Sequence, residues 1–165
     1  VYGIGAFSLS KDINVSRKEA QRYIDDYLTL YSGVDRYMKE VVEKAKEDGY
    51  VETLFHRRRY LPELTASNFN LRAFGERVAR NMPIQGTAAD IIKIAMVRVD
   101  QRLKRENMRA RLILQVHDEL IVECPESEKD AVKALLEREM EGVVRLSVPL
   151  TADAGAGQSW GEAKA

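Results

Sequence analysis

The sequence predicts an α+β fold in which helices pack against antiparallel strands. Apolar residues recur at intervals of three and four in several stretches, which is the spacing of one helix face. Two pairs of short β-prone segments are each joined by a few polar residues, so each pair is expected to form a hairpin. The helices and the paired strands occur in separate runs, which argues against alternating strand–helix winding around a parallel sheet.

The first predicted helix begins at a capping box, in which Ser16 covers an early backbone amide and Glu19 reaches back. A second helix is expected over residues 34–48, and Gly49 is expected to end it. The positions expected to face inward are Ala20, Ile24, Tyr27, Leu28 and Tyr31 in the first helix and Val34, Tyr37, Met38, Val41 and Ala45 in the second.

The middle of the chain is expected to hold a hairpin and two further helices. Residues 50–54 and 58–61 are β-prone and flank a short turn. The third helix is expected to be interrupted or kinked at Pro83, since proline lacks an amide hydrogen. Residues 87–90 resemble a capping signal that begins a long fourth helix. The inward positions of these two helices are Leu71, Phe74, Val78, Ile91, Ile92, Ala95, Met96, Val99 and Leu103.

The last third of the chain is expected to contain a tight hairpin and one more helix. Residues 111–116 and 120–123 are β-prone and are separated by only three polar residues. A helix follows over residues 127–141, and residues 148–152 are expected to form a last short strand. The inward positions of this helix are Ala131, Leu135, Leu136 and Met140.

The composition excludes several classes of protein. Hydrophobic residues make up 45% of the 165 residues, enough for a core and too many for a disordered chain. Lys+Arg and Asp+Glu both number 26, so the total charge does not favour nucleic acid, although its distribution can. The single cysteine, Cys124, excludes an internal disulfide framework and a cysteine-based zinc site. No apolar run approaches the roughly 18 residues of a membrane span, and no segment resembles a signal peptide, so we expect a cytoplasmic protein without membrane contact.

The strongest local signal is His117-Asp118-Glu119 at the tip of the second hairpin. Adjacent carboxylates repel each other by about 1 kcal/mol at 4 Å in water, and a cation removes that conflict. Hard oxygen ligands favour Mg²⁺, which needs only one or two carboxylates besides water and substrate phosphate. An ordinary solvated polar turn explains the same three residues, and the spacing alone does not decide between the two.

Two further groups could contact nucleic acid. Arg77, Asn81 and Gln85 recur every four residues, so they share one face if the helix continues through Pro83, and all can donate hydrogen bonds to phosphates, sugars and base edges. The alternative is a solvated helix face.

Arg57 and Arg58 are candidate phosphate contacts in the first hairpin, or simply basic residues that keep an edge strand soluble. Tyr2, beside Gly3 and Gly5, could form a stacking platform for a base or be a core tyrosine at a helix end.

These residues also carry a resemblance to a known family. Residues 114–120, Leu-Gln-Val-His-Asp-Glu-Leu, resemble the third conserved motif of the family A DNA polymerases. Residues 77–90, which include Asn-Met-Pro-Ile-Gln-Gly-Thr-Ala-Ala-Asp, resemble the segment that precedes that motif. Residues 1–5 resemble the end of the family's fingers helix, and residues 50–64 resemble its intervening hairpin. The resemblance covers essentially the whole chain in the right order.

The resemblance implies a role for each matching residue. Asp118 and Glu119 are the expected catalytic residues: Asp118 resembles the carboxylate that binds two catalytic Mg²⁺ ions, and Glu119 its neighbour, which tunes the site. His117 resembles a contact to the primer end. Arg77, Asn81 and Gln85 resemble DNA-binding contacts near the nascent base pair. Tyr2 resembles the aromatic residue that stacks at the nucleotide and template site.

The implied protein is a template-directed DNA polymerase that acts on primer-template DNA and deoxynucleoside triphosphates in DNA replication and repair. The implied fold is a palm-type antiparallel sheet with packed helices, plus a helical remnant of the fingers. Residues 1–66 are expected to be the end of the fingers subdomain, and residues 67–165 the C-terminal part of the palm. A DNA-binding module without chemistry and a single-subunit RNA polymerase relative are the alternatives.

The sequence departs from the family pattern in two respects. The family's other metal-binding aspartate lies in an Asp-Tyr-Ser motif, which these 165 residues lack, as they lack the basic fingers residues that grip the triphosphate. The apolar start, Val1-Tyr2-Gly3-Ile4-Gly5, indicates a piece of a longer chain. We therefore expect this piece alone to be inactive, and to self-associate through the strand edge that the missing part would cover.

Overall fold

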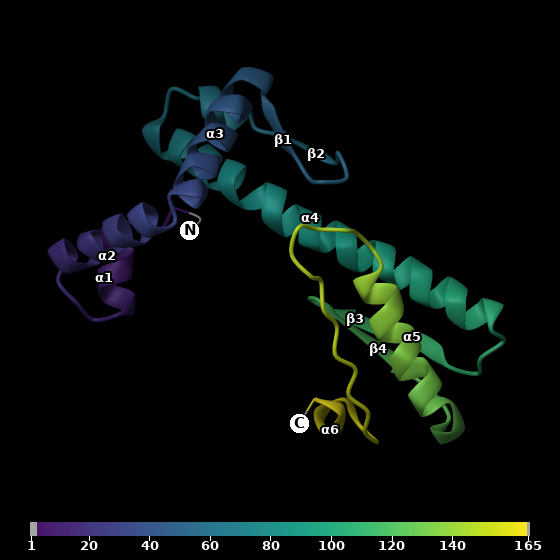
Figure 1. Cartoon of the computed structure of the whole chain (residues 1–165). Helices are drawn as coiled ribbons and strands as arrows, with labels where there is room; N and C mark the ends of the chain where they lie inside the picture. Colours follow the sequence, from purple (N-terminus) through teal and green to yellow (C-terminus); the bar gives the residue numbers. More distant parts are fainter. Residues whose placement is uncertain (1–2, 165) are drawn as a thin grey trace. The chain divides into compact units, whose positions relative to one another are not determined.

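The protein is a mixture of helices and two small antiparallel sheets, as the α+β prediction required (Figure 1). The structure is a computed structural model that describes residues 3–164, and Tyr2 lies outside that range. The chain forms two compact units, residues 1–87 and residues 88–165. The division of function expected between residues 66 and 67 stays a prediction, because compactness alone does not define a functional subdomain.

The first unit contains three helices, one hairpin and the beginning of a fourth helix. Its elements are α1 (Ala6–Asp12), α2 (Arg17–Leu30), α3 (Ser32–Asp48), β1 (Tyr50–Glu52), β2 (Arg58–Tyr60), the 3₁₀ helix η1 (Pro62–Thr65) and the first part of α4 (Phe69–Arg105). The Ser16 hydroxyl accepts a hydrogen bond from the Glu19 amide at 3.2 Å, so the predicted cap begins α2. Gly49 ends α3 with φ 77°, a left-handed conformation that glycine adopts without a Cβ penalty.

The core of this unit lies where α3, the hairpin and α4 meet. Its buried residues are Val42, Ala45, Val51, Leu61, Leu64 and Ala79. Tyr37, which we expected to face inward, is exposed, and Val42 is buried instead. The buried residues of α3, Met38, Val42 and Ala45, follow the four-and-three spacing of one face, which lies one position on from Tyr37 and Val41. The phenol of Tyr37 therefore stays at the surface, where its hydroxyl can reach water.

Helix α4 is one continuous helix from Phe69 to Arg105, with Pro83 inside it. An interruption at Pro83 and the predicted helix start at residues 87–90 are therefore both wrong, whereas the alternative, a kink at Pro83, stays a prediction. Proline lacks the amide that would bond to the carbonyl four residues earlier, but it leaves its own carbonyl free to accept. The hydroxyl of Thr87 donates to that Pro83 carbonyl, so Thr87 bonds within the helix instead of capping a new one.

The second unit packs a hairpin against two helices. It holds the rest of α4, β3 (Arg111–Val116), β4 (Glu119–Glu123), the 3₁₀ helix η2 (Glu126–Glu128), α5 (Lys129–Glu141) and α6 (Trp160–Ala163). Its core residues are Val99, Leu103, Ala110, Val132 and Leu135. Ala131, expected inside, is exposed, and Val132 is buried in its place.

Residues 148–152 do not form the expected last strand. Two carboxylates of α5 instead hold the neighbouring backbone: Glu141 Oε1 accepts from the Ala152 amide and Glu137 Oε1 from the Ala154 amide, both at 3.1 Å. Side-chain acceptors therefore take the place of a strand partner for these two amides. Within residues 3–164, none of the helices is both long and apolar enough to cross a bilayer.

Candidate functional site

The tip of the β3–β4 hairpin presents His117 and Asp118 to solvent. Val116 pairs with Glu119, so these two residues form the whole turn. His117 has φ 51°, a left-handed value that is uncommon outside glycine, and its carbonyl accepts from Gln115 Nε2 at 2.6 Å. Both side chains are exposed, and the hairpin register determines where they stand.

Glu119 stands in different surroundings from Asp118. Its side chain is half-buried, and Oε1 forms an ion pair with Lys164 Nζ at 2.6 Å. The other oxygen, Oε2, is buried without a hydrogen-bond partner among the described residues. A buried carboxylate oxygen without a donor is costly, so this is a position where added positive charge is favourable.

The chain offers a divalent cation few protein ligands. The described residues contain no group of three or more His, Cys, Asp or Glu side chains that could hold a metal ion. A magnesium ion needs only one or two carboxylates when water and phosphate complete its shell. The exposed Asp118 carboxylate and the unpartnered Glu119 oxygen fit that partial role.

A second candidate surface lies on α4, in the first compact unit. Because the helix continues through Pro83, Arg77, Asn81 and Gln85 share one face at intervals of four residues. Arg77 and Gln85 are exposed and Asn81 is half-buried. The Arg77 guanidinium lies 6.0 Å from the centre of the Phe74 ring. We call these three residues the polar stripe of α4.

The β1–β2 hairpin is fixed onto α4 beside the polar stripe. The Leu54 amide donates to Thr87 Oγ1 at 3.0 Å, and Arg57 Nη2 donates to the Gly86 carbonyl at 3.0 Å. A Cβ at Gly86 would lie 2.8 Å from Thr53 Cγ2, closer than side chains approach. Gly86 therefore allows the hairpin to lie directly on the helix.

Sequence reasoning missed this contact, although an isolated glycine in a helical pattern can indicate close approach of another segment.

The two candidate phosphate contacts are engaged within the hairpin region. Arg57 bonds to Gly86, as described above. Arg58 Nε lies 3.4 Å from Glu52 Oε2, and its guanidinium lies 4.4 Å from the centre of the Tyr50 ring. Hydrogen bonds from His56 and Arg58 hold the pKa of Glu52 below its ordinary value, against partial desolvation. The role of Arg57 and Arg58 as phosphate contacts stays a prediction.

The start of the described chain lies against the polar stripe. A Cβ at Gly3 would stand 3.4 Å from Arg80 Nη1 and 3.9 Å from Arg77 Cγ. Gly3 has φ 91°, a value that other residues rarely adopt. The backbone conformation therefore favours glycine at this position, whereas the space around it would accept a Cβ.

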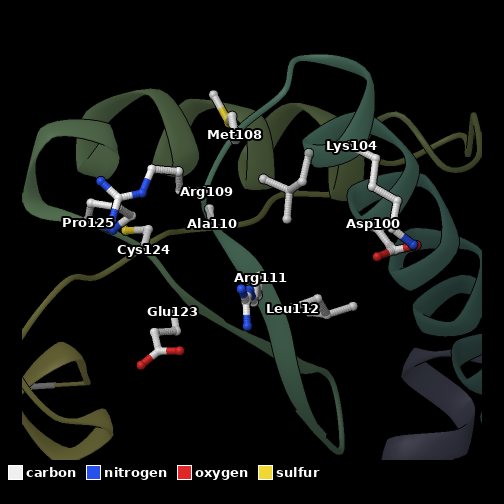
Figure 2. Close-up of a pocket in the computed structure, with 11 residues that line it drawn as sticks. Asp100, Lys104, Met108, Arg109, Ala110, Arg111, Leu112, Glu123, Cys124 and Pro125 are labelled. Carbon is white, nitrogen blue, oxygen red and sulfur yellow. The ribbon is translucent and has the colours of Figure 1, made fainter.

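A hollow of about 800 Å³ lies elsewhere in the second unit, between the end of α4 and the hairpin (Figure 2). Arg109, Arg111, Glu123 and Cys124 are among the residues that line it. Burial raises the pKa of the Cys124 thiol, with Glu128 and Glu126 adding to the effect, so this thiol is a poor nucleophile at neutral pH. None of the residues that we singled out for chemistry lines this hollow.

The chain is similar to known proteins over almost its whole length. The family model for DNA polymerase family A matches residues 1–162. The chain is 52% identical over 164 residues to the DNA polymerase I of Bacillus caldotenax and to that of Bacillus subtilis. Each match covers 99% of this chain and 19% of the relative, so the chain spans about a fifth of their length.

A solved structure has the same fold. It is the POL domain of Pol1 from M. smegmatis in complex with DNA primer-template and dNTP. The TM-score is 0.96 at 44% sequence identity, and the match covers 99% of this chain and 29% of that one.

Proposed function

The chain belongs to DNA polymerase family A, and on that premise we propose that it is the C-terminal part of a template-directed DNA polymerase. The complete enzyme would transfer a deoxynucleotide from its triphosphate to the 3′-hydroxyl of a primer. It would bind primer-template DNA and deoxynucleoside triphosphates. It would act in the cytoplasm, in the replication and repair of DNA. Residues 1–66 would be the end of the fingers and residues 67–165 the C-terminal part of the palm.

One observation carries the proposal: two adjacent carboxylates occupy a tight hairpin tip in different surroundings. Asp118 is exposed, and Glu119 is half-buried with one oxygen paired to Lys164 and the other unpartnered. A surface that only binds DNA has no use for an exposed carboxylate beside a second one, because both repel backbone phosphates. This argues against a DNA-binding module without chemistry.

We assign the metal-binding role to Asp118, with Glu119 as its supporting neighbour. Bound Mg²⁺ ions would supply activation of the primer hydroxyl and stabilisation of the leaving pyrophosphate. Asp118 supplies an anionic oxygen at a position set by the hairpin register, while Glu119 adds negative charge behind it. His117, exposed in the same turn, would contact the primer end.

The polar stripe of α4 would bind the minor groove near the nascent base pair. Every correctly paired base presents minor-groove acceptors at similar positions, so donors such as Arg77 and Gln85 can test pairing without reading sequence. Asn81 stands between them on the same face. Tyr2 would stack at the nucleotide and template site, one residue before the glycine that lies against α4.

Primer extension by the full-length protein that contains this chain tests the proposal. Templated extension with the four deoxynucleotides and Mg²⁺, abolished by a chelator, is the expected result. A preference for ribonucleotides would favour the RNA polymerase alternative. Tight DNA binding without extension under any metal condition would favour the module without chemistry.

A further inference from the structure

The C-terminal segment of the chain folds back on itself and is held by hydrogen bonds between its own residues. Ser159 Oγ accepts from the Glu162 amide at 3.3 Å, and Glu162 Oε2 accepts from the Gln158 amide at 2.9 Å. This pair resembles a capping box, except that Glu162 reaches the amide of the residue before the N-cap, and it encloses a helix of only four residues. A Cβ at Gly155 would collide with the Ala163 carbonyl oxygen, so only glycine permits this fold.

The same segment is fixed at its other end. Glu141 and Glu137 of α5 accept from the amides of Ala152 and Ala154. The chain between α5 and α6 therefore follows a set path that ends beside the β3–β4 hairpin (Figure 1). We call residues 152–164 the C-terminal latch.

The latch brings one positive charge to the carboxylate pair. Lys164 Nζ lies 2.6 Å from Glu119 Oε1 and 5.8 Å from the centre of the Trp160 ring. The Lys164 side chain is 64% exposed, so solvent screens the ion pair and a competing cation can replace it. Asp118, one residue away, forms no ion pair with the described part of the chain.

We propose that Lys164 is a positioning residue for the carboxylate pair. Its ammonium group occupies Glu119 and so competes with a divalent cation for that carboxylate. The inference rests on the proposed metal role of Asp118. With Lys164 in place, the formal charge of Asp118, Glu119 and Lys164 together is −1, and without it the charge is −2. The latch thus keeps Glu119 occupied and leaves Asp118 as the open ligand.

The proposal predicts the direction of change in metal affinity. When Lys164 is neutralised, the carboxylate pair gains attraction for a divalent cation and Glu119 becomes available as a ligand. Glu119 Oε1, which Lys164 now holds, is the oxygen that loss of the lysine would open to a cation. Loss of the lysine should therefore tighten cation binding, whereas a purely structural lysine would loosen it or leave it unchanged.

Mn²⁺ binding to this chain, measured by electron paramagnetic resonance of the free ion, tests the inference without an activity assay. Lys164→Met is expected to bind Mn²⁺ about threefold to tenfold more tightly than wild type, and Lys164→Arg to stay close to wild type. Adding Glu119→Gln to Lys164→Met should remove the gain. Lys93→Met, which removes an exposed lysine of α4 outside the hairpin and the latch, controls for net charge alone.

The sole tryptophan gives a second readout. Trp160 lies in α6, so its fluorescence reports whether the latch is in place. Mg²⁺ should shift the emission of wild type, and Lys164→Met should show the shifted emission before Mg²⁺ is added. Circular dichroism then verifies that the variant keeps its helices.

The outcomes separate this inference from the proposed function. An unchanged or weaker Mn²⁺ affinity in Lys164→Met, or a gain that survives Glu119→Gln, overturns the role of Lys164. If Asp118→Ala has lost Mn²⁺ binding in the same experiment, the metal site itself still stands. If Asp118→Ala binds Mn²⁺ as wild type does, the proposed metal site fails and the inference fails with it.

Discussion

Asp118 and Glu119 are neighbours in sequence, but the hairpin gives them different surroundings. Asp118 lies in the turn and is exposed, whereas Glu119 begins β4 and is half-buried. Lys164, the residue that follows α6, forms an ion pair with Glu119 and not with Asp118. A carboxylate that is already paired is a poorer ligand than an open one, so the two residues should differ in their importance for catalysis.

Asp118→Ala in the full-length polymerase is expected to abolish nucleotide incorporation while leaving primer-template affinity largely intact. Asp118 is proposed to hold metal, whereas affinity for DNA rests on phosphate contacts elsewhere. Single-turnover incorporation with Mg²⁺ and an equilibrium DNA-binding titration measure the two properties. Glu119→Ala should cost less.

Glu123→Ala, at the exposed far end of β4, is the matched control and should behave as wild type. Activity of Asp118→Ala within about tenfold of wild type, or 1.4 kcal/mol of barrier, would remove Asp118 from the site.

Gly86→Ala is expected to destabilise this chain by about 1–3 kcal/mol, because the added methyl meets Thr53 Cγ2 at 2.8 Å. Thr53 is only 3% exposed and its hydroxyl accepts from the amides of Phe55 and Arg57, so it cannot easily move. Urea unfolding measures the free energy.

Thr53→Ser removes the offending carbon, keeps the hydroxyl and should rescue Gly86→Ala. Gly33→Ala, in α3 with open space around it, is the control and should change stability by less than about 1 kcal/mol. A Gly86→Ala variant as stable as Gly33→Ala would mean that the hairpin does not lie on α4 as described.

At the scale of elements, the continuity of α4 decides the geometry of the polar stripe. The spacing of apolar residues at intervals of three and four predicted helix on both sides of Pro83, and that prediction is confirmed. The proline rule predicted an interruption, which was wrong: α4 runs through Pro83 with one backbone hydrogen bond fewer, and Thr87 Oγ1 donates to the Pro83 carbonyl and accepts from the Leu54 amide. That second bond joins positions 33 residues apart, and local sequence patterns carry no information about such a contact.

Arg77→Ala and Gln85→Ala in the full-length polymerase are expected to slow extension and to weaken discrimination between matched and mismatched primer ends. Each removes a proposed donor to a minor-groove acceptor, a loss worth about 1–3 kcal/mol. Extension rates from matched and mismatched primers measure it. Lys93→Ala, exposed on the same helix but outside the polar stripe, should leave discrimination unchanged. Equal behaviour of all three variants would leave the polar stripe as an ordinary solvated face.

At the scale of the whole molecule, local sequence patterns predicted the hairpins and most of the helices. The features that these patterns did not predict depend on contacts between residues that are distant in sequence. The turn at His117 and Asp118 and the cap at Ser16 follow from a few adjacent residues. The failed strand at residues 148–152 and the Lys164 contact depend on α5 and the hairpin tip, which are distant in sequence. A lysine in the last turn of a polar tail gives no signal in one sequence that it pairs with Glu119.

This chain alone is expected not to extend a primer, even with Mg²⁺ and all four deoxynucleotides. The described residues contain no cluster of three acidic, His or Cys side chains, and one carboxylate pair does not fix two ions about 3.5–4 Å apart. A primer-extension assay with the chain at high concentration tests this, and the full-length polymerase is the positive control. Robust templated extension by the chain would refute the argument that a further carboxylate is required.

The chain is also expected to self-associate through the β3–β4 hairpin. Within residues 3–164 this sheet has two strands, so each strand has one edge without a strand partner there, and such edges recruit other chains. Ile113 is 57% exposed and Leu114 47% exposed on β3, which adds apolar surface to that edge. Sedimentation velocity over a range of concentrations should show dimers or larger species.

Ile113→Lys should reduce association, because a charge on an edge strand opposes pairing. Val97→Lys, at a similarly exposed position on α4, should not reduce it. A chain that stays strictly monomeric at high concentration, or that responds equally to both lysines, would exclude the hairpin edge as the associating surface.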